Sequence, residues 1–218
     1  MDEQVLKNIK RANIKLDHMI DVNNHLIEQG RSTKAELIIG LPGETKKTFL
    51  NGLDNVLNSN STSVTIYTLM MLHGTEFKNP EYRKQFGYKG KFRIVPLNFG
   101  NYQNKKIFDY EEVGIQTKDL SFEDYLYLRV IALLVESLHN GRPFNEFFLY
   151  GKHHNIQQAS LLKILYDNIN KASKNIQKII QDFIDDTKDE LWDTEKELLD
   201  FYRKEENFFK LKNGEVGG

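Results

Sequence analysis

Apolar residues recur at two different periods along the chain, and the change of period separates expected helices from expected strands. Between residues 2 and 29 they fall at helical spacing, which predicts one or two amphipathic helices ending at Gly30. A short apolar run from Ala35 to Ile39 predicts a strand. This run stops in Gly40-Leu41-Pro42-Gly43, a turn sequence in which glycine permits backbone conformations that other residues avoid.

A helix and a second strand are expected after this turn. Thr45 is placed to cap a helix whose apolar stripe continues to Leu57, before the polar cluster at residues 58–61. The run from Val64 to Leu72 predicts the second strand. A strand, a helix and a strand within this length predict a βαβ unit with two parallel strands and a right-handed crossover.

The pattern changes after Gly74 and divides the chain into three parts. We expect the α/β part to occupy residues 1–76, and an irregular connecting region with short strands to occupy residues 77–120. A helical region is expected over residues 121–218, beginning with a helix that Ser121 caps. The remaining elements are short strands at Phe92–Leu97 and Val113–Thr117, and helices at 145–152, 156–169 and 176–208.

The composition narrows the classes of function. The 218 residues include 30 basic and 31 acidic ones, so the chain has no broad field to attract nucleic acid or a membrane surface. The acidic, polar start is unlike a signal peptide and no apolar run is long enough to span a bilayer, which predicts a cytoplasmic protein. There is no cysteine, which removes disulfides, thiolate nucleophiles and cysteine-held clusters from what this chain does alone.

Two parallel strands make an incomplete domain, because a parallel sheet needs further strands and cover on both faces. We therefore expect an N-terminal portion to precede Met1, which would then be an internal methionine. The exposed sheet edge left without that portion also predicts a homodimer.

The segment Glu36-Leu37-Ile38-Ile39-Gly40-Leu41-Pro42-Gly43-Glu44-Thr45 resembles the fifth barrel strand and turn of radical S-adenosylmethionine (SAM) enzymes. Residues 2–11 are similar to that family's fourth helix, and residues 67–76 to its sixth strand. Residues 117–125 resemble a region following the barrel in the cobalamin-binding branch. The resemblance implies an α/β fold: a fragment of a partial parallel (β/α) barrel, containing strands five and six, followed by a mainly helical C-terminal region.

The resemblance also implies a partial SAM site. Arg11 matches a basic residue that pairs with the methionyl carboxylate, and Ile38 matches an apolar contact to adenine. These residue types suit the chemistry, because guanidinium binds carboxylate in a bidentate way and a β-branched side chain is a stiff wall for a purine. The six implied SAM-binding positions are Arg11, Glu36, Ile38, Gly40, Tyr67 and Thr68.

In the family, three cysteines on a loop after strand one hold a 4Fe–4S cluster that cleaves SAM to a radical. The resemblance implies that this cluster, and cobalamin, belong to the preceding N-terminal half, with which this chain would combine. We therefore expect an oxidoreductase or methyltransferase portion that is inactive alone, has no catalytic or metal-binding residue of its own, and acts on an unknown substrate.

Other interpretations stay open. The chain is alternatively a non-catalytic helical interaction module that contains a βαβ unit. A phosphate-binding role for residues 40–45 is disfavoured, because no lysine-serine pair completes a phosphate loop.

Several side chains have a structural interpretation. Arg11 is equally a solvated helix residue, and Glu44 is expected to support the next helix through its dipole. A solvated surface is expected for His139, His153 and His154. Helix packing is expected for the aromatic residues Phe144, Phe147, Phe148 and Tyr150. A stripe late in the chain is expected to be buried and consists of Leu191, Leu198 and Phe201.

Overall fold

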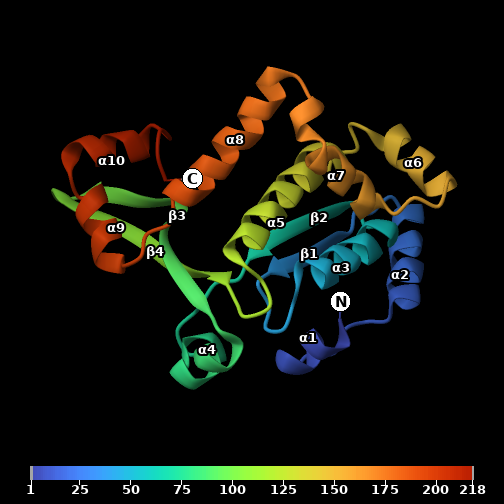
Figure 1. The fold of residues 1–218 in the computed structure, drawn as a ribbon, viewed down its shortest axis with the longest axis horizontal. Coiled ribbons are helices and arrows are strands. Elements are labelled where there is room, and N and C mark those ends of the chain that lie inside the picture. The colour runs from blue at the N-terminus through green and yellow to red at the C-terminus, as the bar shows by residue number, and fades with distance from the viewer. Residues whose placement is uncertain (1, 218) are drawn as a thin grey trace.

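Two parallel strands joined by a helix form the centre of the computed structural model, which describes residues 2–217 (Figure 1). Strand β1 (Lys34–Ile39) pairs with β2 (Ser63–Thr68) in register from Lys34 opposite Ser63 to Ile39 opposite Thr68. Helix α3 (Lys46–Asn58) connects them and begins in a capping box between Thr45 and Thr48. The predicted βαβ unit and its cap are therefore confirmed.

Two helices precede β1, as the apolar spacing predicts. Helix α1 (Glu3–Asn8) is capped by the Asp2 side chain, and α2 (Leu16–Glu28) follows after a short linker. Asn23 of α2 is buried and donates a 2.8 Å hydrogen bond to the carbonyl oxygen of Ser59. This bond fixes α2 to the loop between α3 and β2.

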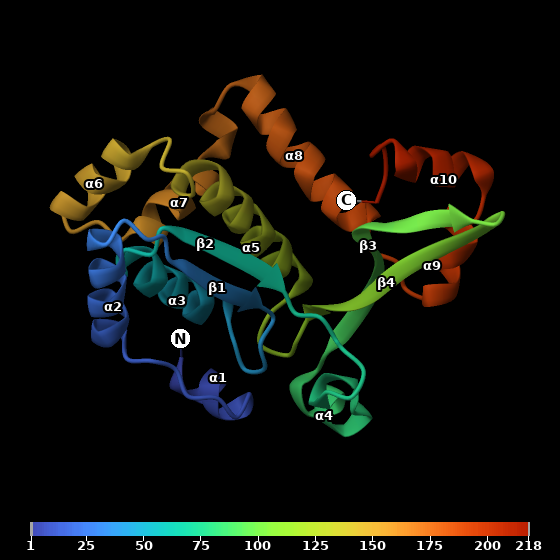
Figure 2. The same cartoon turned by 180° about the vertical axis from the view of Figure 1, so that it is seen from behind.

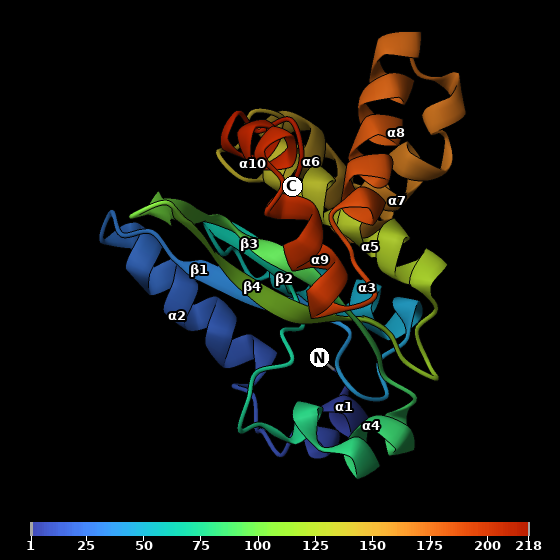
Figure 3. The same cartoon turned by 90° about the vertical axis from the view of Figure 1, so that its left-hand side faces the viewer.

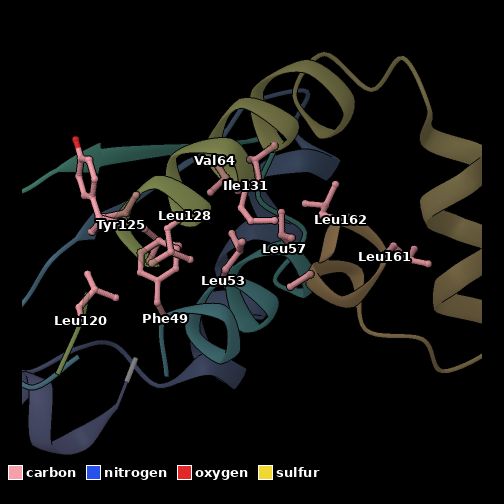
Figure 4. Packing of buried hydrophobic residues seen from close by; sticks show 14 of the residues in the cluster. Phe49, Leu53, Leu57, Val64, Leu120, Tyr125, Leu128, Ile131, Leu161 and Leu162 are labelled. Atoms are coloured by element: carbon pink, nitrogen blue, oxygen red, sulfur yellow. The ribbon is translucent and has the colours of Figure 1, made fainter. Parts of the chain in front are cut away.

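The largest core lies on one face of the parallel pair. Helices α3 and α5 (Phe122–Leu134) pack there, with α7 (Gln158–Asp167) beside them, and Leu53, Leu128 and Leu162 are fully buried between them (Figure 4). Burying each such side chain stabilises the fold by about 1.5–3 kcal/mol. The opposite face of β1 and β2 has no helix over it within the described residues (Figure 2).

Residues 89–116 form one long antiparallel hairpin of β3 (Lys89–Tyr102) and β4 (Lys105–Gln116). The expectation of an irregular region with two short strands is therefore wrong for this segment. Apolar and polar residues do not alternate regularly along these strands, because polar residues also pair across the ladder, as in the 2.7 Å ion pair between Arg93 and Glu111. The Met71 amide donates to the carbonyl oxygen of Glu112 at 2.8 Å, so β4 is joined by an isolated antiparallel bridge to the segment that follows β2.

Three helices replace the single helix expected over residues 176–208. They are α8 (Lys174–Asp189), α9 (Glu195–Tyr202) and α10 (Glu205–Lys212). The chain leaves α8 because the backbone of Trp192 pairs with that of Phe92 in β3 through two 2.8 Å hydrogen bonds. Helices α9 and α10 then cover the hairpin, and the predicted buried stripe is confirmed, with Leu191 and Leu198 buried and Phe201 half-buried (Figure 3).

The remaining elements are short. Helix α4 (Pro80–Phe86) follows a 3₁₀ turn (Glu76–Lys78) and is tied to β4, because Lys78 and Arg83 both bind the buried carboxylate of Glu112. The other elements are a π-turn (Val135–His139), α6 (Asn145–His153) and a 3₁₀ turn (Ile169–Lys171).

Helix α6 shows a further departure from expectation. Of the four aromatic residues at its start and along it, only Phe148 is buried. Phe147 is 42% exposed and lies edge-on against Phe148, whereas the packing expected for Phe144 and Tyr150 is wrong because both are exposed. Among the helices of residues 2–217, none is long and apolar enough to cross a membrane.

Candidate functional site

The turn after β1 lies where ligands gather in α/β folds, at the carboxyl ends of parallel strands. Gly40 and Gly43 both have left-handed backbone conformations, with φ of 96° and 84°. The Glu44 amide donates to the Leu41 carbonyl oxygen at 3.1 Å, and Thr45 then caps α3. The sequence folds this way because glycine tolerates the positive φ that this tight reversal requires.

Gly40 is also required by the hairpin. A Cβ atom at Gly40 would lie 3.3 Å from the carbonyl oxygen of Gly114 in β4. The close backbone approach that glycine permits here is therefore made by β4, whether or not a ligand also approaches.

The uncovered face of the parallel pair carries a polar cluster. The Lys34 ammonium lies 3.1 Å from a carboxylate oxygen of Glu36 and donates to the Tyr67 hydroxyl at 3.2 Å. The Tyr67 hydroxyl in turn donates to Glu36 at 3.5 Å, and its side chain is 42% exposed. Hydrogen bonds to Glu36 and then to Tyr67 raise the pKa of Lys34 above its ordinary value. Lys34 and Glu36 share this face because side chains alternate along β1, whereas the register between β1 and β2 brings Tyr67 to them.

Alternation along the strands separates the two predicted positions on β2. Tyr67 is opposite Ile38 on the uncovered face, whereas Thr68 is opposite the buried Ile39 and is itself buried. The Thr68 hydroxyl lies 3.5 Å from the hydroxyl of Tyr125 in α5. The structure therefore brings Tyr67, and not the Thr68 side chain, onto the face that holds Glu36 and Ile38.

A cavity of about 860 Å³ lies along the free edge of β1. Arg11, Glu36 and Ile38 line it, together with residues of α1, α2 and α3 and of the segment around Phe77. Gly40, Tyr67 and Thr68 are outside its lining. Within residues 2–217 the Arg11 side chain takes part in no ion pair, so its guanidinium is available to a ligand.

Glu44 is buried directly beside this turn. Its side chain is 4% exposed, and its Oε2 atom has no hydrogen-bond partner among the described residues. Burial raises the pKa of Glu44 from 4.5 to about 8, so the carboxyl group is mostly protonated near neutral pH. The expected support of α3 by a charged Glu44 is therefore wrong, because the Thr45–Thr48 capping box satisfies the helix end instead.

The histidines do not converge. His153 and His154 are exposed at the end of α6, whereas His139 is half-buried with its ring against Phe148. No group of three or more histidine, aspartate or glutamate residues suited to a metal ion is present in the part of the chain that the structure describes.

Comparison with known proteins gives the chain its relatives. No family model matches it. It is 26% identical over 144 residues to the cobalamin-dependent radical SAM methyltransferase TokK of Streptomyces tokunonensis. It is 27% identical over 144 residues to the 2-(S-pantetheinyl)-carbapenam-3-carboxylate methyltransferase of Streptantibioticus cattleyicolor.

Each match covers 64% of this chain, which spans about a fifth (21%) of the length of either relative. The glycine turn after β1 and the match to two enzymes of one kind agree with the sequence resemblance. The two matches therefore support a relationship of this chain to the radical SAM family, in the branch of the cobalamin-dependent enzymes.

Proposed function

We propose that this chain is the C-terminal portion of a radical SAM methyltransferase and supplies part of the SAM pocket. The observation that carries the proposal is the position of the Gly40 turn, at the end of a parallel strand that presents Glu36 and Ile38 to the cavity. Arg11, in the linker between α1 and α2, lines the same cavity. In this proposal β1 and β2 are strands five and six of a partial barrel.

The ligand contacts follow from residue chemistry. Arg11 binds the methionyl carboxylate, because a guanidinium offers paired donors that match a carboxylate. Ile38 forms the wall against adenine, while Glu36 and Tyr67 accept or donate hydrogen bonds on the same face. Gly40 contributes its backbone, and Thr68 supports strand β2 from the side that packs on α5.

The chain's own residues bind and orient, and they do not hold the electron source. A 4Fe–4S cluster, which supplies the electron for SAM cleavage in this family, is held by cysteine thiolates, and this chain has no cysteine. No donor set for the cluster is therefore present here, and we assign the cluster to a preceding part of the same enzyme. Because one relative is a cobalamin-dependent radical SAM methyltransferase, we assign cobalamin to that preceding part too.

The free edge of β1 is where that preceding part would join. An edge strand presents unpaired amide and carbonyl groups, which a further parallel strand would satisfy. In the isolated chain we propose that a second copy pairs at this edge instead, giving a homodimer.

A methyl-resolved titration tests the proposed site. In protein labelled with ¹³C at isoleucine methyl groups, SAM is expected to shift the Ile38 signal saturably. The signal of Ile115, which is buried in the largest core, is expected to stay in place. Arg11→Gln is expected to weaken SAM binding roughly tenfold or more, because a charge-assisted hydrogen bond contributes about 1.5–3 kcal/mol.

Two controls isolate the carboxylate contact. Arg31→Gln changes an exposed arginine outside the cavity lining and is expected to leave SAM affinity unchanged. Binding of 5′-methylthioadenosine, which lacks the carboxylate, is expected to be insensitive to Arg11→Gln. An Ile38 signal that does not move with SAM contradicts the proposal.

A further inference from the structure

Tyr88 lies just before β3, and its side chain is buried beneath the Gly40 turn. It is 7% exposed, and its hydroxyl donates a 2.8 Å hydrogen bond to the carbonyl oxygen of Gly40, 48 residues away in sequence. Its ring packs in a small separate core with Leu41, Leu69 and Met71. Because water does not compete for a buried hydrogen bond, this contact restrains the Gly40 peptide more strongly than an exposed one would.

The rest of the turn is held from two other directions. The Asn8 side chain of α1 donates a 2.8 Å hydrogen bond to the carbonyl oxygen of Pro42. Gly114 of β4 lies against Gly40, and the Gly114 amide donates to the carbonyl oxygen of Leu69 at 2.9 Å. Of these restraints, only the Tyr88 hydroxyl is a side-chain group that bonds to Gly40 itself.

We infer that Tyr88 is a positioning residue for the SAM-binding turn. Its hydroxyl fixes the Gly40 peptide plane, so the backbone that follows Ile38 is ordered before the ligand arrives. A site that is already ordered spends less binding free energy on ordering, and affinity rises accordingly. This inference rests on the proposed function, because it assumes that SAM binds at this turn. It also gives the hairpin a part in binding, since Tyr88 reaches the turn from the start of β3.

The test replaces only the hydroxyl, in Tyr88→Phe. SAM affinity is expected to fall roughly two- to twelvefold, the effect of one lost hydrogen bond of about 0.5–1.5 kcal/mol. The matched control is Tyr202→Phe, which alters another buried tyrosine, 2% exposed, in the core between the hairpin and α9. That variant is expected to bind SAM as the wild-type protein does.

A spectroscopic signal separates positioning from general stability. Glycine followed by leucine occurs only at Gly40-Leu41 and Gly52-Leu53. Labelling glycine with ¹³C at the carbonyl and leucine with ¹⁵N therefore gives two carbonyl–amide correlations, with Gly52 in α3 as the internal reference. In Tyr88→Phe the Gly40 carbonyl signal is expected to move upfield while the Gly52 signal stays in place.

The outcomes are distinct. Wild-type protein that does not bind SAM overturns the proposed function itself. Wild-type binding with unchanged affinity in Tyr88→Phe, or a Gly40 carbonyl signal that does not move, overturns only the role of Tyr88. If Tyr88→Phe fails to fold, 3-fluorotyrosine is placed at position 88 instead. Its hydroxyl is a stronger donor, so the Gly40 carbonyl signal is expected to move downfield, and a stationary signal overturns the role of Tyr88.

Discussion

Glu44→Gln is expected to stabilise the protein, and the gain is expected to grow with pH. Burial raises the pKa of Glu44 from 4.5 to about 8. The folded protein therefore retains a proton that the unfolded chain has lost between these two values. The stability that depends on the neutral Glu44 carboxyl is fully present below the unfolded pKa and is lost as the pH rises through the folded pKa. Glutamine keeps the shape of the neutral acid and does not ionise.

The magnitude follows from the pKa difference. One pKa unit corresponds to roughly 1.4 kcal/mol, so the wild-type protein loses about 3 kcal/mol by pH 7 and about 5 kcal/mol above pH 8. Glu44→Gln lacks this loss. The difference in free energy of unfolding between the variant and the wild-type protein is thus expected to rise by about 3 kcal/mol from acidic to neutral pH.

Urea denaturation between about pH 5 and pH 9 measures this difference, with m-values checked for agreement between the proteins. Glu28→Gln, an exposed change at the end of α2, is the control and is expected to follow the wild-type curve. Parallel curves for Glu44→Gln and the wild-type protein would mean that Glu44 is as easily ionised in the folded state as in the unfolded one, and would contradict this prediction.

Two further substitutions test the joints between the hairpin and the parallel pair. Gly40→Ala is expected to cost roughly 1–3 kcal/mol in free energy of unfolding, because it combines a positive φ with a 3.3 Å contact to Gly114. The control, Gly30→Ala, has no atom within 4 Å of its new Cβ and is expected to cost less. Equal costs in thermal unfolding would show that β4 does not crowd Gly40. Glu112→Ala is expected to cost roughly 3–5 kcal/mol, since it leaves the cations of Lys78 and Arg83 without their carboxylate. Although burial opposes the shift, Arg83 and Lys78 lower the pKa of Glu112. The stabilisation by the Glu112 ion pairs is therefore present above the unfolded pKa and is lost as pH falls through the folded pKa. Acid-unfolding midpoints that agree between the wild-type protein and Glu112→Ala would contradict this prediction.

The sequence predicts the centre of the fold because its apolar residues keep a clear period there. The run from Ala35 to Ile39 and the stripe of α3 each have one buried face, and the structure confirms both. The hairpin is different. Its strands are held by polar ladders and by α9 and α10, which lie about a hundred residues further along, so local periodicity does not reveal them.

The end of the chain shows the same limit. A charged helical pattern over residues 176–208 does not reveal that Trp192 leaves the helix to pair with β3, since that choice depends on a distant strand. The candidate site likewise combines features that the local sequence predicts with features that depend on distant packing. The glycine turn and its flanking strand residues are predicted from the sequence, whereas the burial of Glu44 and the Tyr88 hydrogen bond arise only from the packing of α1, α4 and the hairpin around the turn.

In the function we propose, the Gly40 turn and the uncovered face of β1 bind the adenosine part of SAM. The most direct measurement is an isotope-filtered nuclear Overhauser experiment between unlabelled SAM and protein labelled at isoleucine methyl groups. Contacts are expected from the adenine protons to the Ile38 methyl groups. Adenine contacts that bypass Ile38 and fall on isoleucines elsewhere, or no contacts at saturating SAM, would contradict it.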